Sequence, residues 1–242
     1  MTAATTLGMG LTLSRVGIAY GSNHVIDGLD LEVRPGEILV IAGKSGCGKS
    51  TLLRALAGLR NPDTGTIRAD GVPVERPSAD RALVFQDDAL LPWRTVRNNI
   101  GFALRLRGYS RADSKAKALR WIDEVGLTGY ADYLPRDLSG GMRQRVQLAR
   151  SLAGSPRAVL MDEPFGALDT QTRADMQRLL IETWKAHPTT IVFVTHDLDE
   201  ALRLGDRVAV LGNGQLRAVL DVPQPRQSVD RSALKAQILE YL

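Results

Sequence analysis

The stretch ILVIAGKSGCGKST, residues 38–51, decides the fold, because it joins a buried strand to a glycine-rich loop and the start of a helix. Its apolar first part, residues 38–42, has the length of a strand and is too short for a helix. Residues 43–51 then satisfy the pattern G-x-x-x-x-G-K-[ST] of a phosphate-binding loop, in the position between strand and helix that the mechanism requires. An ordinary glycine-rich turn would not need the lysine and the hydroxyl in this register. The stretch therefore predicts a site for the phosphates of a nucleotide.

Each residue type in this loop has a physical reason. The glycines let backbone N–H groups turn inward around phosphate oxygens, and the N-terminus of the following helix adds positive potential. Lys49 is expected to reach the β- and γ-phosphates of ATP, and the Ser50 hydroxyl to ligate Mg²⁺. The expected nucleotide-binding residues of the loop are Gly43, Lys44, Ser45, Gly46, Cys47, Gly48, Lys49, Ser50 and Thr51.

Cys47, the single cysteine of the chain, lies inside this loop and has two interpretations. A redox switch is conceivable, since a helix N-terminus lowers the pKa of a thiol. We favour the other interpretation, in which the position contributes its backbone and the side chain is incidental. Thiol reagents are then expected to inhibit by crowding ATP.

The segments around the loop predict a parallel sheet covered by helices. Alternating apolar residues between Leu11 and Tyr20 predict an edge strand, and the helix after the loop, with Leu59 on its apolar side, is closed by Gly58. Residues 95–153 have long helical periods. Short β-rich runs follow at residues 158–161, 190–195 and 207–211. Because helical segments separate these runs, we expect the first and last thirds of the chain to share one sheet.

Composition limits the classes of function. The chain has 242 residues, 44% of them hydrophobic and 24% charged, as expected for one globular unit. No apolar run approaches the roughly 18 residues that a membrane helix needs, so any transport would require another chain for the pore. The N-terminus lacks the features of a secretory signal, which favours a cytosolic location. The net charge of +4 comes from scattered basic residues, so we expect a solvated surface and no nucleic-acid partner.

A second constellation is the run AVLMDE, residues 158–163, an apolar strand that ends in two carboxylates. Asp162 is placed to hold Mg²⁺ directly or through water, and Glu163 to polarise an attacking water as a general base. An acidic pair at a strand end is common on protein surfaces. The phosphate loop upstream favours the catalytic interpretation, and together the two motifs predict a P-loop ATPase.

The run LSGGMRQR, residues 138–145, narrows the class, because it resembles the LSGGQ signature of the ABC ATPase family, with Met142 in place of the usual glutamine. Ser139, Gly140 and Gly141 would form a second glycine-opened helix N-terminus, which is a further anion site. A simple helix cap by Ser139 is the alternative. Two phosphate-facing helix ends can serve one ATP only if the second comes from another subunit. The head-to-tail dimer of this family therefore explains why one chain carries both a phosphate loop and a signature segment.

The resemblance extends from Tyr20 to Leu211 with the family's elements in order. It implies that Tyr20 stacks on adenine, that Gln86 senses Mg²⁺ and water, that Asp169 lies at the dimer interface, and that His196 contacts the γ-phosphate and orients Glu163 without needing a charge. For three of these residues the alternative is structural: a buried Tyr20, a surface Gln86 and a helix-capping pair at His196 and Asp197. The metal ligands implied are Ser50, Gln86 and Asp162.

The fold that the resemblance implies is α/β, with a P-loop (RecA-like) parallel sheet core, an N-terminal antiparallel β subdomain and an inserted helical signature subdomain. Residues 1–222 would form the ABC ATPase domain, with the helical subdomain at approximately 95–155. Residues 223–242 would form a short C-terminal tail with a helix at 232–242.

Within the family, residues 86–97, with LLPW at 90–93, and residues 161–173 look like the nitrate, sulfonate and taurine importer branch. This resemblance implies an ATPase subunit of an importer at the cytoplasmic face of the inner or plasma membrane. Its partners would be a second copy or a closely related ATPase, an integral-membrane permease and, indirectly, a periplasmic or surface solute-binding protein. Leu91 and Trp93, beside Gln86, are expected either to receive a permease helix or to plug the junction between the helical lobe and the sheet.

Two other classes compete with this interpretation. A non-transport ABC ATPase that acts on DNA or ribosomes would usually carry a long coiled-coil insertion or a second cassette, and this chain has neither. A P-loop kinase is disfavoured by the signature segment, and a GTPase by the lack of a plausible guanine-reading N-K-x-D segment.

Overall fold

The structure is a computed structural model that describes residues 8–87, 89–227 and 229–242. The N-terminal start, which lacks the features of a secretory signal, falls largely on residues 1–7, outside the described residues. Within the described ranges, no helix is both long enough and apolar enough to cross a membrane.

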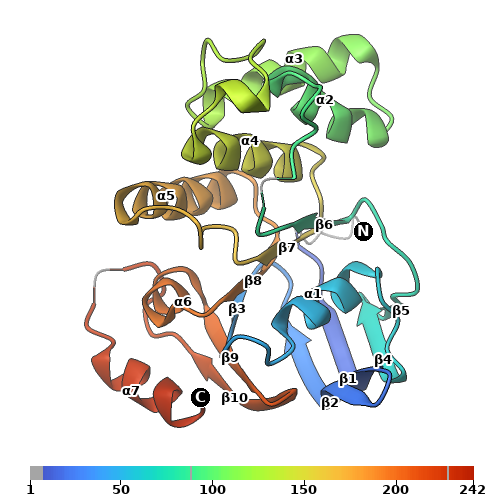
Figure 1. Ribbon diagram of the computed structural model, residues 1–242, viewed down its shortest axis with the longest axis vertical. Helices are drawn as coiled ribbons and strands as arrows, with labels where there is room; N and C mark the ends of the chain where they lie inside the picture. Colours follow the sequence, from blue (N-terminus) through green and yellow to red (C-terminus); the bar gives the residue numbers. More distant parts are fainter. Residues whose placement is uncertain (1–7, 88, 228) are drawn as a thin grey trace, which may run out of the picture.

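A six-stranded sheet forms the centre of the molecule (Figure 1). In spatial order its strands are β10 (Gln215–Asp221), β9 (Arg207–Gly212), β3 (Ile38–Ala42), β8 (Thr190–Thr195), β7 (Ala158–Asp162) and β6 (Arg81–Val84). All neighbouring pairs are parallel except β10 with β9. Because β3 pairs with both β8 and β9, the first and last thirds of the chain share this sheet as predicted.

A second, antiparallel sheet is built from the N-terminal part of the chain. Its order is β2 (Asn23–Val33), β1 (Leu11–Tyr20), β4 (Thr64–Ala69) and β5 (Val72–Pro73). The prediction that β1 is an edge strand is wrong, because β1 pairs with both β2 and β4. Strand β2 was not predicted, because the apolar alternation of residues 23–33 is interrupted near Gly28, which adopts a left-handed backbone (φ 58°).

The helices cover the central sheet on both faces. Helix α1 (Lys49–Ala57) packs with the antiparallel sheet and one face of the central sheet in a shared apolar cluster. Helices α2 (Val96–Leu106), α3 (Arg111–Glu124) and α4 (Gly140–Ala153), with the short 3₁₀ helix Pro135–Asp137, form one end of the molecule (Figure 1). Helices α5 (Thr170–Ala186), α6 (Leu198–Leu204) and α7 (Ser232–Glu240) complete the other side.

Helix α1 ends as predicted, since Gly58 adopts a left-handed conformation (φ 78°) as its C-cap. Leu59 therefore lies beyond the helix and is exposed, so its predicted place on the apolar side is wrong.

The strand order explains where a site forms. Strands β3, β8 and β7 are parallel neighbours, so the loops that follow Ala42, Thr195 and Asp162 meet at the same edge of the sheet. Open parallel sheets bind ligands at this carboxyl edge. The phosphate-loop, carboxylate and histidine motifs each follow one of these three strands.

Candidate nucleotide site

The phosphate loop connects β3 to α1 and is closed by Lys49. The Nζ of Lys49 donates hydrogen bonds to the backbone carbonyls of Gly43, at 2.8 Å, and Lys44, at 3.0 Å. The side chain is buried to 4% exposure, whereas most lysines are solvated. An ammonium has three donors, so one remains for a ligand held by the loop.

Two glycines of the loop are required by close backbone approach. A Cβ at Gly43 would lie 2.4 Å from the carbonyl oxygen of Leu211. Gly48 has φ 106°, and a Cβ there would lie 2.8 Å from the carbonyl oxygen of Val25. Glycine at these two positions therefore permits the loop conformation. This conformation leaves the backbone N–H groups of the loop accessible to an anion.

Asp162, the last residue of β7, meets Ser50 at the start of α1. The hydroxyl of Ser50 donates to Oδ1 of Asp162 at 2.9 Å, although 112 residues separate them in sequence. Burial raises the pKa of the Asp162 carboxyl above its usual value, and the hydrogen bond from Ser50 opposes part of this shift. A hydroxyl and a carboxylate oxygen side by side are donors that suit Mg²⁺.

Glu163 follows directly and lies between a lysine and a histidine. Its Oε1 is 3.8 Å from Nζ of Lys49, and its Oε2 is 2.8 Å from Nδ1 of His196. The residue adopts a left-handed backbone (φ 43°), which is uncommon outside glycine and is found often at functional sites. The three motifs thus converge on one carboxylate at the edge of the sheet.

The contact with Glu163 restricts how His196 can act. A carboxylate only accepts, so Nδ1 of His196 carries the proton in this pair, and a neutral ring then offers Nε2 as an acceptor. Donating from Nε2 to a phosphate at the same time requires the imidazolium. Orienting Glu163 through Nδ1 needs no charge on the ring, whereas an additional donation from Nε2 to a phosphate does, contrary to the expectation that an uncharged His196 serves both.

Cys47 is 8% exposed and packs in the apolar cluster around α1. Burial raises the pKa of its thiol, while the charge of Lys49 and backbone N–H groups act in the opposite direction. This shift is opposite to the lowered pKa that would favour a redox switch. The geometry agrees with a position that contributes its backbone.

The signature segment begins α4, with Ser139 as its N-cap. The hydroxyl of Ser139 accepts a hydrogen bond from the backbone N–H of Met142 at 3.3 Å. A Cβ at Gly141 would lie 2.7 Å from Cγ2 of Thr172, so this glycine allows α5 to approach. Asp169 caps α5 by accepting from the backbone N–H and the hydroxyl of the same Thr172.

Signature and phosphate loop lie in different parts of the molecule. The apolar residues of α4 belong to the cluster that includes the helical end, whereas those of α1 belong to the cluster under the antiparallel sheet. Within the described ranges, no hydrogen bond or ion pair joins residues 139–141 to residues 43–51. One chain therefore does not bring its own two anion sites together in this structure.

The remaining predicted side chains are accessible. The ring of Tyr20 is 49% exposed and lies 5.7 Å from the guanidinium carbon of Arg60. Gln86 is exposed in the bend that follows β6. Neither is a core residue, so the buried alternative for Tyr20 does not hold.

Two buried amides that sequence analysis missed hold the segment after Gln86. Asn99, fully buried on α2, accepts from the backbone N–H of Leu91 and donates to the carbonyls of Leu91 and Arg94. Gln147 on α4 donates to the carbonyls of Phe85 and Asp87 on both sides of Gln86. The available signal was a polar residue on the apolar face of each predicted helix.

The segment itself borders an apolar groove of about 450 Å³ between β6, α2 and α4. Leu91 lines this groove, together with Phe85, Phe102 and Leu106. Trp93, two residues after Leu91, is 73% exposed, whereas Leu90 is buried. The exposure of Trp93 contradicts the idea that it plugs the junction with the sheet.

A glycine loop that closes on a lysine, a hydroxyl–carboxylate pair and a second carboxylate at one sheet edge define a P-loop nucleotide-hydrolysing protein. The family described as ABC transporter matches residues 26–166, more than half of the chain. The chain belongs to this family and is an ATPase of the ABC class, as the sequence predicted.

Individual relatives agree with this assignment. The chain is 46% identical over 217 residues to the taurine import ATP-binding protein TauB of Chromobacterium violaceum, covering 89% of this chain and 83% of that protein. It is 43% identical over 246 residues to the aliphatic sulfonates import ATP-binding protein SsuB of Yersinia pestis, covering 99% and 89%. A dimeric post-hydrolysis structure of the ATP-binding cassette MJ0796 with ADP and Pi superposes with a TM-score of 0.77 at 29% identity, covering 88% of this chain and 98% of that one.

Proposed function

We propose that this chain is the ATP-hydrolysing subunit of an importer for small organic anions of the sulfonate type, and that it works as a dimer on a separate permease. The observation that carries the proposal is the near full-length similarity to sulfonate and taurine import subunits, combined with the convergence of Lys49, Asp162, Glu163 and His196 at one sheet edge. The subunit would act from the cytoplasmic face of the membrane. A solute-binding protein would deliver the anion on the other side.

Each residue has a role that follows from its place. The phosphate loop and the third donor of Lys49 bind the β- and γ-phosphates, and the exposed ring of Tyr20 supports the adenine. Glu163 takes a proton from the attacking water, and His196 holds the carboxylate in place through Nδ1. Asp169, at the start of α5, would lie at the dimer interface.

Ser50 and Asp162 would hold Mg²⁺, with Gln86 as a further ligand. The described residues contain no group of three or more acidic, histidine or cysteine side chains suited to a metal, so phosphates and water would complete the coordination shell. The ion would neutralise charge that develops on the transferred phosphoryl group.

The groove beside Gln86 is the proposed docking site for a permease helix. Its apolar lining and the exposed Trp93 form a surface that a solitary soluble protein gains little by exposing. Gln147 fixes the backbone on both sides of Gln86, and Asn99 fixes the turn that carries Leu91. A shift at the γ-phosphate would therefore reach the permease through a short, rigid path.

Trp93→Ala should weaken permease association by about tenfold or more, because buried tryptophans are frequent hot spots of interfaces. Since the side chain is 73% exposed, the free energy of unfolding of the isolated chain should change by less than about 0.5 kcal/mol. Pull-down with the permease measures association, and thermal melting measures stability. ATP affinity should be unchanged.

Leu59→Ala is a suitable control, since Leu59 is also an exposed apolar residue but follows α1 and does not line the groove. It should leave association intact. If Trp93→Ala lowers the melting temperature markedly and the folded fraction still binds the permease, Trp93 belongs to the core and the docking proposal fails for it.

The proposed function is tested by purifying the tagged full-length chain from native membranes with ATP and Mg²⁺. We expect a permease with several membrane spans to co-purify, and cells that lack the chain to lose uptake of taurine or alkanesulfonates. Recovery with DNA or ribosomes, without a permease, would instead assign the chain to the non-transport ABC ATPases.

A further inference from the structure

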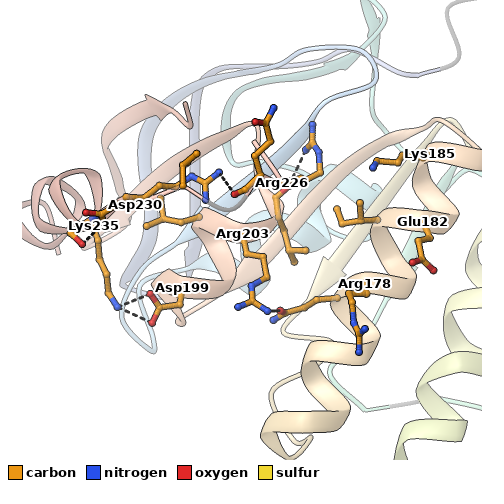
Figure 2. Close-up of a pocket in the computed structure, with 16 residues that line it drawn as sticks. Arg178, Glu182, Lys185, Asp199, Arg203, Arg226, Asp230 and Lys235 are labelled. Carbon is orange, nitrogen blue, oxygen red and sulfur yellow. Dashed lines mark hydrogen bonds and ion pairs between the residues drawn. The ribbon is translucent and has the colours of Figure 1, made fainter. Parts of the chain in front are cut away.

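A cavity of about 710 Å³ lies away from the nucleotide site, between α5, α6 and the segments 226–227 and 229–235 (Figure 2). Arg178, Glu182 and Lys185 of α5 line one side, and Asp199 and Arg203 of α6 lie opposite (Figure 2). None of the residues assigned above to ATP, Mg²⁺ or permease binding lines it. The volume is in the range of small-molecule sites.

The lining is cationic. Six basic residues face three acidic ones, which are Glu182, Asp199 and Asp230. The basic residues are Arg178, Lys185, Arg203, Arg226, Arg231 and Lys235. Two further carboxylates, Asp175 and Asp206, lie outside the lining and pair with two of these cations, so only part of the positive charge is left for a ligand.

Half of these cations are already paired with carboxylates. Arg178 pairs with Asp175, Arg226 with Asp206, and Lys235 with Asp199.

The other three have no such partner. Within the described ranges no carboxylate lies within ion-pair distance of Lys185, Arg203 or Arg231. Arg231 donates only to backbone carbonyls, and its buried Nε has no hydrogen-bond partner there. That Nε is shielded from solvent, so an anion in the cavity would pair with accessible cations such as Lys185 and Arg203, whose side chains are exposed.

The cavity also has an apolar part. Ile181, Leu202, Leu204 and Val229 line it between the charged groups. Leu202 and Leu204 are buried and belong to the core cluster, so this wall is rigid. A ligand that fits both parts has a negatively charged head and a short apolar body.

A hydrogen-bond chain leads from the cavity toward the catalytic residues. Arg203 donates to Oε1 of Gln177 at 3.3 Å, and Nε2 of that buried amide donates to Oε1 of Glu200 at 3.0 Å. Glu200 sits in the first turn of α6, where its backbone N–H donates to the capping Asp197. His196 immediately precedes this cap and contacts Glu163.

We propose that this cavity is a regulatory site for a small organic anion, a carboxylate or sulfonate with an apolar body, and that occupancy lowers the rate of ATP hydrolysis. The anion draws the guanidinium of Arg203 away from its long hydrogen bond with Gln177, which loosens the contact with Glu200 and the cap that positions His196. Because the cavity does not touch the phosphate loop, ATP affinity is unaffected. The regulatory effect rests on the proposed function, whereas the binding site does not.

Calorimetric titration of the purified full-length chain with 1-hexanesulfonate tests the site directly. Saturable binding is expected, with much weaker binding of inorganic sulfate, which lacks the apolar body, and of hexylammonium, which has the opposite charge. Lys185→Gln and Arg203→Gln should each weaken hexanesulfonate binding severalfold. Arg120→Gln is the matched control, since Arg120 is exposed on α3 at the far end of the molecule.

The regulatory effect is measured as ATP turnover of the assembly with its permease. Saturating hexanesulfonate should lower turnover by about fivefold or more, within the usual range of allosteric coupling. Lys185→Gln should keep the basal rate and need more anion for the same inhibition. Gln177→Met removes the amide that contacts Glu200 but no charge, so it should keep anion binding, have a lowered turnover without the anion, and show no further inhibition when the anion is added. If that variant does not fold, Lys185→Gln and Arg203→Gln still decide the site.

Three results would overturn the proposal. The absence of saturable binding, or binding that Lys185→Gln and Arg203→Gln leave unchanged, removes the site. Binding at the cavity without any change in turnover removes its regulatory role. An assembly that hydrolyses no ATP would contradict the proposed function instead, and the binding titration would still decide the site.

Discussion

Glu163→Gln should bind ATP with near-normal affinity and hydrolyse it about 10²–10⁴-fold more slowly, the usual contribution of a general base. The amide has the size of the carboxylate and can still accept from Nδ1 of His196, so the loop geometry is preserved. It cannot take a proton from water at neutral pH. ATP-bound dimers should therefore accumulate, which size-exclusion chromatography with ATP detects.

The control is Glu75→Gln, which removes an exposed carboxylate remote from the sheet edge and should leave turnover unchanged. Nucleotide binding and thermal melting of both variants separate a chemical defect from a folding defect. Turnover of Glu163→Gln close to that of the unmodified chain, measured with the permease present, would show that another group or the substrate itself accepts the proton.

Segments with residue types at a fixed, chemically required spacing could be predicted from the sequence, whereas segments with an interrupted pattern could not. The phosphate loop and the carboxylate strand could be predicted because glycine, lysine and carboxylate at fixed spacing have few other uses. The strand β2 could not, because Gly28 breaks its alternation, and the place of β1 in the sheet was wrong as a result.

Side-chain environments were harder to predict than elements. The burial of Leu90 beside the exposed Trp93 depends on how α2 packs, which no local pattern encodes. Asn99 and Gln147 are polar residues whose partners are backbone carbonyls elsewhere in the chain, and sequence alone does not show those partners. The raised pKa of Cys47 likewise depends on burial by other segments, and reverses what its place at a helix N-terminus suggests.

The convergence on Glu163 could be predicted in part. The alternation of strands and helices predicted a parallel sheet, and parallel strands place the loops that follow them at one edge, but the order of the strands came from the structure. The contact between His196 and Glu163 was also expected from the family resemblance. The protonation conflict between that contact and a phosphate contact arises because the ring nitrogen that faces the carboxylate, here Nδ1, must carry the single proton of a neutral imidazole.

Ser139→Arg should lower ATP turnover by about 10²-fold or more without weakening ATP binding to the separate chain, because an arginine would displace the anion-binding N-terminus of α4 from the phosphates. The phosphate loop that binds ATP in the same chain is untouched. Lys49→Ala should instead impair binding or turnover directly. Equal mixtures of the two variants contain heterodimers in which one site has an intact lysine and an intact serine. Activity above both separate variants would support signature residues that act in trans.

Cross-linking is the more decisive test, because a heterodimer with one intact site would be inactive if its two ATP sites must act together. In a chain that carries Cys47→Ala, Ser45→Cys and Ser139→Cys, a disulfide requires the two Cα atoms to approach within about 7 Å. The two apolar clusters place these positions in different parts of one chain, so we expect ATP-dependent covalent dimers on a non-reducing gel, most of all with Glu163→Gln. Chains that carry only one of the two introduced cysteines are the control and should stay monomeric. Cross-links confined to a single chain would show that the signature serves its own phosphate loop, and the composite site would have to be abandoned.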